Sequence, residues 1–166
     1  MKKLLSLILA IVLIAVFGVF ALASGEDAAT NQGSGTVSGD NGDATEEIGD
    51  YSVVIDSCRL AKDWNGGDVV IVKYIFTNNN SDESANFMFA FDNEVYQGGV
   101  GLNEAYFLAD SANYDSGNQT KDIKKGASIE VEVAYELNDT TTDIEVELQE
   151  LFSFDDTTIT KTFSLK

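Results

Sequence analysis

Acidic side chains dominate the residues of this chain that could carry out chemistry, and histidine is absent. The 166 residues include 28 Asp and Glu, 10 Lys and Arg, one Cys and no His, with a formal net charge of −18. Without histidine there is no imidazole general base, no Ser-His or Cys-His nucleophile pair and no His-based zinc site. A single cysteine excludes an intramolecular disulfide and a thiolate metal cluster. The chemistry that is left is that of carboxylates and of hard cations.

Pairs of carboxylates at alternate positions are the one catalytic constellation that this composition permits. Glycoside hydrolases use one carboxylic acid and one base or nucleophile, usually about 5 to 9 Å apart. Glu130 with Glu132 and Glu145 with Glu147 form such pairs, but alternate positions of an amphipathic strand share its solvent-facing side. We therefore interpret both pairs as a solvated, aggregation-resistant surface. A small carboxylate-dependent hydrolase is the third functional hypothesis.

Two groups of oxygen ligands make calcium binding the stronger alternative. Asp92 and Glu94 flank an asparagine, and Asp110 and Asp115 lie in a loop rich in Asn, Ser and Gly. Calcium takes six to eight oxygen ligands, and neither group has the spacing of an EF-hand loop. Because Asn, Asp and Gly also favour turns, we interpret both groups first as turns. A calcium-dependent adhesion or sensing domain with these four carboxylates as ligands is the second hypothesis. Apart from the calcium of that hypothesis, no cofactor is expected.

Aromatic side chains near the predicted loops are the candidates for contact with a ligand or partner. Trp64 precedes the turn dipeptide Asn65-Gly66, where its ring could stack on a sugar, contact a protein or cover the edge of the core. The same interpretations apply to four aromatic residues in the middle of the chain, namely Tyr96, Tyr106, Phe107 and Tyr114.

The first 23 residues have the pattern of an export signal. Lys2 and Lys3 precede an unbroken apolar run over residues 4–23, which ends in the small-residue triplet Ala21-Leu22-Ala23. Small side chains at this place favour cleavage by a signal peptidase before Ser24. About twenty apolar residues can also span a bilayer, so an uncleaved signal anchor is the alternative. Both interpretations place the rest of the chain outside the cytoplasm.

Two further regions follow the signal. Residues 24–50 consist mostly of Gly, Ser, Thr, Asn, Asp and Glu, a composition that cannot bury enough surface to offset the entropy of ordering. We predict a disordered acidic stalk there. Residues 51–166 are enough for one domain with a hydrophobic core, but not for two.

Alternation of apolar and polar side chains predicts that this domain is all-β. The alternation is clear in the last three predicted strands, whereas residues 69–76 and 87–91 are apolar on both faces, as in central or covered strands. No convincing helical periodicity is present. The predicted strands are 51–60, 68–77, 85–91, 94–101, a short one at 105–108, 128–137, 143–152 and 157–165. Such strands predict an immunoglobulin-like antiparallel β-sandwich of seven or eight strands with Greek-key connections.

Three sequence blocks carry a resemblance to a known family. They are residues 72–78 (VKYIFTN), 95–102 (VYQGGVGL) and 123–129 (IKKGASI) with 134–137 (AYEL). Together they resemble an uncharacterised family of secreted or lipid-anchored immunoglobulin-like domains from Gram-positive bacteria, over about residues 50–165. The resemblance implies a β-sandwich at the cell envelope and supplies no catalytic residues.

The chain departs from the lipid-anchored members of that family, which carry a modified cysteine directly after the signal. Its one cysteine, Cys58, lies inside the predicted domain, where we expect it to be buried in the core.

These features predict an exported, non-catalytic binding or interaction module at the bacterial cell envelope. Its partner would be an unidentified envelope protein or polymer. Binding to nucleic acid is not expected, because the negative charge of the chain repels phosphate groups. Contact with the membrane is expected only through residues 4–23, if the signal stays uncleaved.

Overall fold

The computed structural model describes residues 36–37, 45–79, 82–153 and 157–166. Every described residue belongs to one compact unit, Gly33–Lys166. The predicted signal and most of the predicted stalk lie outside the described residues. Within the described ranges, no helix is long and apolar enough to cross a membrane.

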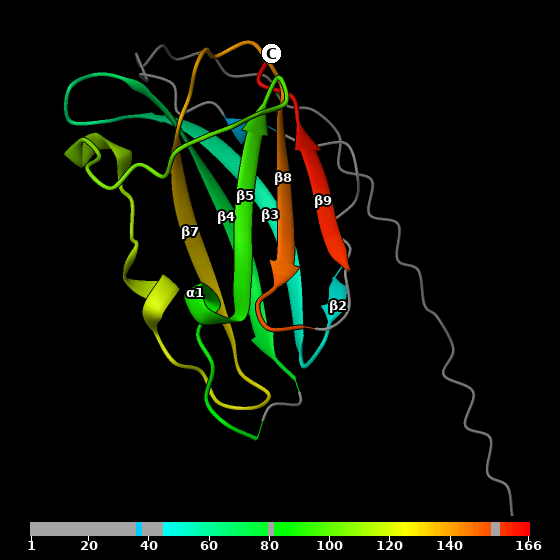
Figure 1. Ribbon diagram of the computed structural model, residues 1–166. Helices are drawn as coiled ribbons and strands as arrows, with labels where there is room; N and C mark the ends of the chain where they lie inside the picture. The colour runs from blue at the N-terminus through cyan, green and yellow to red at the C-terminus, as the bar shows by residue number, and fades with distance from the viewer. Residues whose placement is uncertain (1–35, 38–44, 80–81, 154–156) are drawn as a thin grey trace, which may run out of the picture. The chain divides into compact units, whose positions relative to one another are not determined.

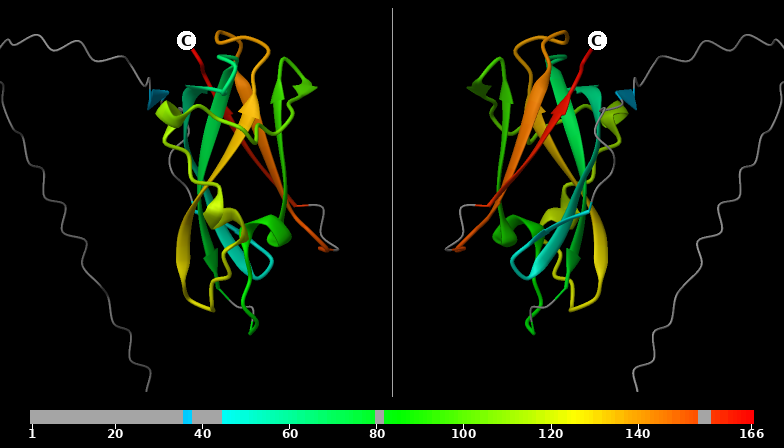
Figure 2. Two further views of the ribbon diagram at one scale, coloured as in Figure 1. Left: turned by 90° about the vertical axis from the view of Figure 1, so that its left-hand side faces the viewer. Right: turned by 90° about the vertical axis from the view of Figure 1, so that its right-hand side faces the viewer.

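The described residues fold into two antiparallel sheets that face each other (Figures 1 and 2). The first sheet contains β1 (Thr36–Val37), β2 (Glu46–Ile48), β3 (Tyr51–Lys62), β4 (Asp68–Asn78) and β7 (Ser128–Glu136). The second sheet contains β5 (Phe91–Gln97), β6 (Val100–Gly101), β8 (Ile144–Glu150) and β9 (Thr158–Phe163). The helical segments are α1 (Phe87–Ala90) and the 3-10 turns η1 (Asp110–Ala112) and η2 (Gly117–Thr120).

The order of the strands confirms the predicted all-β sandwich. β4 pairs with β3 and β7, and β5 pairs with β6 and β8, which in turn pairs with β9. The chain therefore passes between the sheets three times, after β4, after β6 and after β7.

The predicted strand over residues 85–91 is wrong. Residues Phe87–Ala90 form α1, because the Asn86 side chain caps the turn by accepting a hydrogen bond of 3.2 Å from the Phe89 N–H. An apolar run with such a cap can form one helical turn before the chain extends again. β5 then begins at Phe91.

Two other predicted strands are also corrected. The strand over 94–101 is divided, because Gly98 and Gly99 adopt φ values of +59° and +77° between β5 and β6; such values favour glycine. Residues 105–108 form no strand, and isolated bridges lie beside and within this segment, from Glu104 to Tyr135 and from Leu108 to Asp63.

The first sheet begins inside the predicted stalk. β2 pairs with β3 through the register Ile48 to Tyr51, and the Ile48 side chain is only 4% exposed. The prediction of disorder is therefore wrong at β2, because a single buried isoleucine and a hairpin attach this segment to the core.

The main core fills the space between the sheets. Its largest fully buried side chains are Tyr74, Tyr135, Phe76, Phe163, Ile144 and Leu148. Cys58 is buried, as expected, and burial raises the pKa of its thiol to about 12. Lys161 on the edge strand β9 also points inward, and its Nζ donates to the carbonyl oxygens of Ile55 (2.6 Å) and Asp56 (3.1 Å), where the β3 register shifts.

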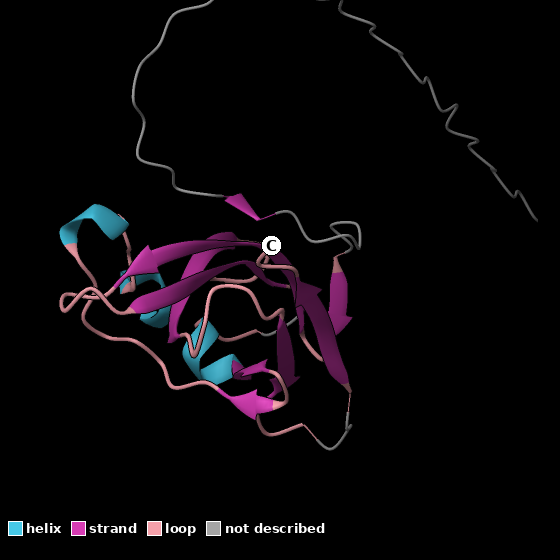
Figure 3. Ribbon diagram, turned by 90° about the horizontal axis from the view of Figure 1, so that it is seen from above, coloured by secondary structure: helices cyan, strands magenta, loops and turns pink. Residues whose placement is uncertain are grey.

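A second, smaller core lies on the outer side of the first sheet. Val69, Ile71 and Ala134 point away from the main core and pack against Ala105 and Ala112. Both of these alanines belong to residues 102–127, which link β6 to β7 and which we call the β6–β7 connection. This connection crosses the outer side of the first sheet, and its η1 turn stands outside the strands (Figures 2 and 3).

Candidate functional site

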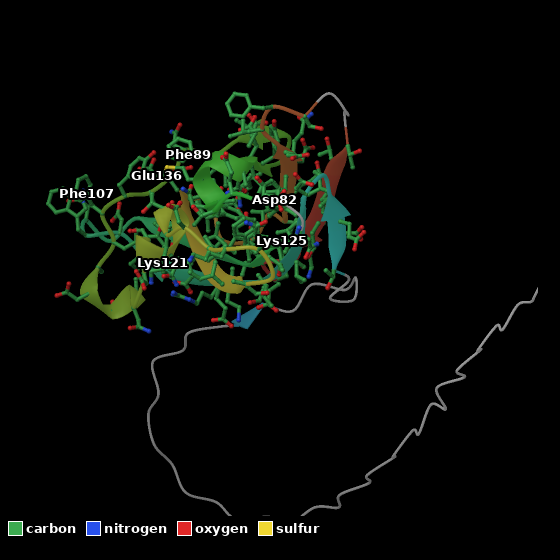
Figure 4. The ribbon with its side chains drawn as sticks, turned by 90° about the horizontal axis from the view of Figure 1, so that it is seen from below. Asp82, Phe89, Phe107, Lys121, Lys125 and Glu136 are labelled. Atoms are coloured by element: carbon green, nitrogen blue, oxygen red, sulfur yellow. The ribbon has the colours of Figure 1, made fainter. Side chains whose placement is uncertain are left out.

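Three exposed aromatic side chains form one surface at the end of the first sheet. Trp64, Tyr106 and Phe107 are 70%, 74% and 75% exposed, and together with Leu108 they line an open hollow of about 500 Å³. We call Trp64, Tyr106 and Phe107 the aromatic patch. The Phe107 side chain stands at the margin of the described part of the molecule (Figure 4). Three of the five predicted contact residues are thus brought together.

Main-chain hydrogen bonds hold the two segments of the aromatic patch. The Trp64 N–H donates to the Phe107 carbonyl (3.2 Å), and the Ala109 N–H donates to the Lys62 carbonyl (3.0 Å). The β3–β4 turn is itself fixed because Asp63 Oδ1 accepts hydrogen bonds from the N–H groups of Asn65 (2.8 Å) and Gly67 (2.7 Å). The patch therefore rests on ordered backbone and not on independent loops.

The other two predicted contact residues lie elsewhere. Tyr114 is half-buried in a neighbouring hollow of about 550 Å³ that it shares with Tyr106. Its hydroxyl accepts a hydrogen bond of 3.0 Å from Gln119, and burial raises its pKa. Tyr96 is on the outer side of the second sheet, where its hydroxyl donates to Glu94.

The four predicted calcium ligands do not form one group. Asp92 and Glu94 lie on β5, whereas Asp110 and Asp115 line the hollow beside Tyr114. Within the described part of the chain, no three acidic or cysteine side chains converge as metal ligands would. Asp115 instead accepts a hydrogen bond of 2.8 Å from the Gly117 N–H, as expected of a turn residue.

The carboxylate pairs lie on outward faces of strands. Glu132 accepts from the Arg59 guanidinium at 3.0 Å through both oxygens, and Glu130 lies 3.8 Å from the Lys73 ammonium. Glu145 and Glu147 alternate with buried residues of β8. These positions agree with the interpretation of a solvated surface.

Sequence reasoning missed Arg59, which fastens the β6–β7 connection to the first sheet. Besides Glu132, Arg59 donates to the carbonyl oxygens of Ala112 (2.6 Å) and Asn113 (3.2 Å). Arg59 is the single arginine of the chain. A lone arginine in an apolar strand was the sequence feature that could have indicated this role, because a guanidinium can bind a carboxylate and carbonyls at once.

The fold and this surface define a two-sheet antiparallel β-sandwich with exposed aromatic side chains at one end. Residues 26–150 match the family described as a domain of unknown function, DUF5067, and the chain belongs to that family. The predicted membership of an uncharacterised family is confirmed. No curated protein matches the chain.

Two solved structures are similar to this chain. One is described as a "putative lipoprotein" from Bacillus subtilis; it is 16% identical with a TM-score of 0.55, over 75% of this chain and 39% of that one. The chain thus spans less than half of the Bacillus protein, and the likeness shows a shared fold. The other, also described as a "putative lipoprotein", is from Staphylococcus aureus; it is 18% identical with a TM-score of 0.47, over 74% of this chain and 92% of that one.

Proposed function

We propose that this protein is an exported, non-catalytic binding module of the bacterial cell envelope, and that the aromatic patch is its contact surface. The observation that carries the proposal is the meeting of Trp64, Tyr106 and Phe107, each at least 70% exposed. Single apolar side chains are common on protein surfaces, whereas a contiguous group marks an interaction site. Tyrosine and tryptophan are also enriched among the residues that dominate binding energy.

The rigidity of the aromatic patch also supports a role in binding. Backbone hydrogen bonds join the β3–β4 turn to the β6–β7 connection at Trp64 and Ala109. A surface that is ordered before binding loses less conformational entropy on association than a mobile loop does. The patch can therefore contribute binding energy from its aromatic area without first having to fold.

The export part of the proposal rests on the N-terminal pattern. Lys2 and Lys3 before the apolar run at 4–23 have the form of a signal. The description of the Bacillus sandwich as a "putative lipoprotein" agrees with a place at the envelope. Fractionation of cells that express the full chain tests this part, and recovery of the protein in the cytoplasm would contradict it.

The chemistry of the side chains favours binding over catalysis. The chain has no histidine, and Glu130 and Glu132 lie near basic side chains on the outer side of the first sheet. An open, ion-paired face offers no shielded site in which one carboxylate would stay protonated as a general acid.

Binding is tested by sedimentation of the protein with purified Gram-positive cell walls that retain their attached proteins. We expect the double variant Trp64→Ala, Phe107→Ala to bind about tenfold more weakly or worse, as for residues at the centre of a contact. Phe152→Ala is the matched control, because Phe152 is 90% exposed but lies outside the aromatic patch. Failure of the unchanged protein to sediment with the walls, or equal binding by the double variant, would refute the proposal.

A further inference from the structure

Two hollows adjoin at the aromatic patch. The first, of about 500 Å³, is lined by Trp64, Tyr106, Phe107 and Leu108, and we call it the aromatic hollow. Tyr106 and Leu108 also line a second hollow of about 550 Å³, whose other lining residues lie within 109–116 and which we call the polar hollow. Because the two hollows share these residues, a single extended ligand can enter both.

The polar hollow offers hydrogen-bonding groups that the protein does not use. The side chains of Asp110, Asn113 and Ser116 are exposed in it and have no hydrogen-bond partner within the described part of the chain. Asp115 uses only its Oδ1, which accepts from the Gly117 N–H at 2.8 Å. These four side chains supply both donors and acceptors, since amide and hydroxyl groups donate and carboxylates accept.

The charge of the two hollows favours a neutral ligand over an anionic one. Among the described residues that line them, the charged ones are Asp110 and Asp115, and none is Lys or Arg. A polymer that carries phosphate or carboxylate groups would be repelled. A hydroxyl group of a neutral ligand can instead donate to an ionised carboxylate, and such charge-assisted hydrogen bonds are the stronger ones.

Tyr106 stands between the hollows with a fixed ring. Its hydroxyl donates a hydrogen bond to Glu104, which raises the pKa of Tyr106. The main chain beside it is held as well, since the Ala105 N–H donates to the Ala134 carbonyl at 2.8 Å. One aromatic face is therefore presented to both hollows without a search among rotamers.

Arg59 and Glu132 hold the loop that forms the polar hollow. Arg59 donates to the Ala112 carbonyl at 2.6 Å, and Glu132 accepts from the Asp115 N–H at 3.4 Å. These two side chains are themselves paired at 3.0 Å. The polar hollow is thus ordered before any ligand binds, which lowers the entropic cost of association.

We propose that the two hollows together bind a neutral glycan chain, with one sugar ring on the aromatic side chains and the next ring hydrogen-bonded in the polar hollow. A pyranose ring has an apolar C–H face and a rim of hydroxyl groups, and these match the two kinds of surface that adjoin here. Ligand sites typically combine aromatic walls with a few placed polar groups. The inference rests on the proposed function, because it names the ligand class of the aromatic patch.

The arrangement of the polar groups fits a protein partner less well. In protein interfaces a polar rim surrounds an apolar centre. Here the free polar side chains, Asp110, Asn113 and Ser116, gather in a hollow of their own on one side of the aromatic residues. A chain of sugar units needs such a succession of stacking and hydrogen-bonding positions.

The test uses Trp64, the single tryptophan of the chain, as a probe of the aromatic hollow. The protein is titrated with cellohexaose and with N-acetylchitohexaose, and calorimetry of the same titrations gives the Kd. We expect a saturable change of the Trp64 emission with at least one of these neutral hexamers, and the tighter of the two assigns the site to a plain or to an N-acetylated glycan. Hexagalacturonate, which carries a carboxylate on each ring, should bind about tenfold more weakly or worse.

Asp110→Ala tests the polar hollow separately from the aromatic one. We expect it to weaken binding of the neutral hexamer by about tenfold, because a charge-assisted hydrogen bond is lost. Glu145→Ala is the matched control, since it removes the same charge from an exposed position on the second sheet and lines neither hollow.

Failure of the glycan inference can be told apart from failure of the proposed function. No binding of either neutral hexamer, equal or tighter binding of hexagalacturonate, or unchanged binding by Asp110→Ala would overturn the inference. The proposed function would survive that result if sedimentation with cell walls still depended on Trp64 and Phe107. Loss of sedimentation after protease treatment of the walls would then assign the aromatic patch to a protein partner and overturn the glycan inference as well.

Discussion

The two outer faces of the sandwich differ in what covers them. On the first sheet, Val69 and Ile71 of β4 are buried beneath the β6–β7 connection. On the second sheet, Asp92, Glu94 and Glu145 point away from the core and form no ion pair within the described residues. One face is thus a second core, and the other is an open acidic surface.

This difference bears on where the sandwich places the residues of the aromatic patch. The covered face fixes the β6–β7 connection, and the connection in turn supplies Tyr106 and Phe107 to the aromatic patch. The open face supplies repulsion between like charges, which opposes edge-to-edge association. The candidate binding residues therefore gather where a long connection is held against a sheet, and the other sheet presents an acidic surface.

The largest effect is expected when a side chain beneath the β6–β7 connection is removed. Ile71→Ala should lower the free energy of unfolding by about 3 kcal/mol, because Ile71 is 1% exposed and its loss leaves a cavity. Glu145→Ala on the open face should change it by less than about 0.5 kcal/mol. Urea unfolding of both variants measures the difference, and similar values would show that the connection does not form a second core.

A smaller effect is expected from the side chain that fastens the connection. Arg59→Ala should cost about 2 kcal/mol, because it leaves the partly buried Glu132 carboxylate and the Ala112 carbonyl without their donor. Hydrogen exchange should become faster at residues 110–119 and remain unchanged in β8 and β9.

Lys62→Ala is the matched control for the arginine, because Lys62 forms an exposed pair with Asp68 at 2.6 Å. Exposed pairs contribute about 0 to 1 kcal/mol. If exchange in residues 110–119 is the same in Arg59→Ala and in the unchanged protein, apolar packing alone holds the connection.

The strands with clear alternation could be predicted from sequence, and the coverage of the faces could not. The expected strand at 128–137 is β7 over Ser128–Glu136, and the one at 143–152 is β8 over Ile144–Glu150. In both strands the alternating large apolar side chains face the main core, whereas Ala134 of β7 belongs to the second core. Local period and tertiary burial therefore agree for the large side chains. The apolar outer side of residues 69–76 did indicate a cover, but not which segment supplies it.

Local chemistry overrode the apolar pattern at α1. Residues 87–91 have the composition of a strand, yet the Asn86 cap and the change of direction into β5 produce one helical turn. Periodicity cannot separate a short helix from a strand in an apolar run of this length.

The candidate sites were predictable residue by residue but not as groups. Trp64, Tyr106 and Phe107 were identified from their place near loops, whereas their meeting depends on a backbone bond between residues 64 and 107. Residues 64 and 107 are too far apart in the sequence for a spacing rule to predict their contact.

The smallest effect is expected for the pKa of Tyr96 on the open face. The hydrogen bond to Glu94 raises the pKa of Tyr96 from its ordinary value of 10.0 to about 12. Because the folded-state pKa lies above the ordinary value, this bond stabilises the fold fully below pH 10 and its contribution is lost as the pH rises through 12. Glu94→Gln should return the pKa of Tyr96 toward 10, as measured by NMR titration of ¹³C-labelled tyrosine.

Glu147→Gln separates the hydrogen bond from general repulsion on the same face. Glu147 lies directly opposite Glu94 in the register of β5 and β8, and it affects Tyr96 only through its charge. Its removal should lower the pKa of Tyr96 by less than Glu94→Gln does, since a charge without a hydrogen bond acts through solvent and is screened. Equal effects of the two variants would mean that the open face acts on Tyr96 as a diffuse negative field. In that case the two faces would differ more than the structure indicates. The covered face would have a specific contact between Arg59 and Glu132, and the open face would have no specific contact at Tyr96.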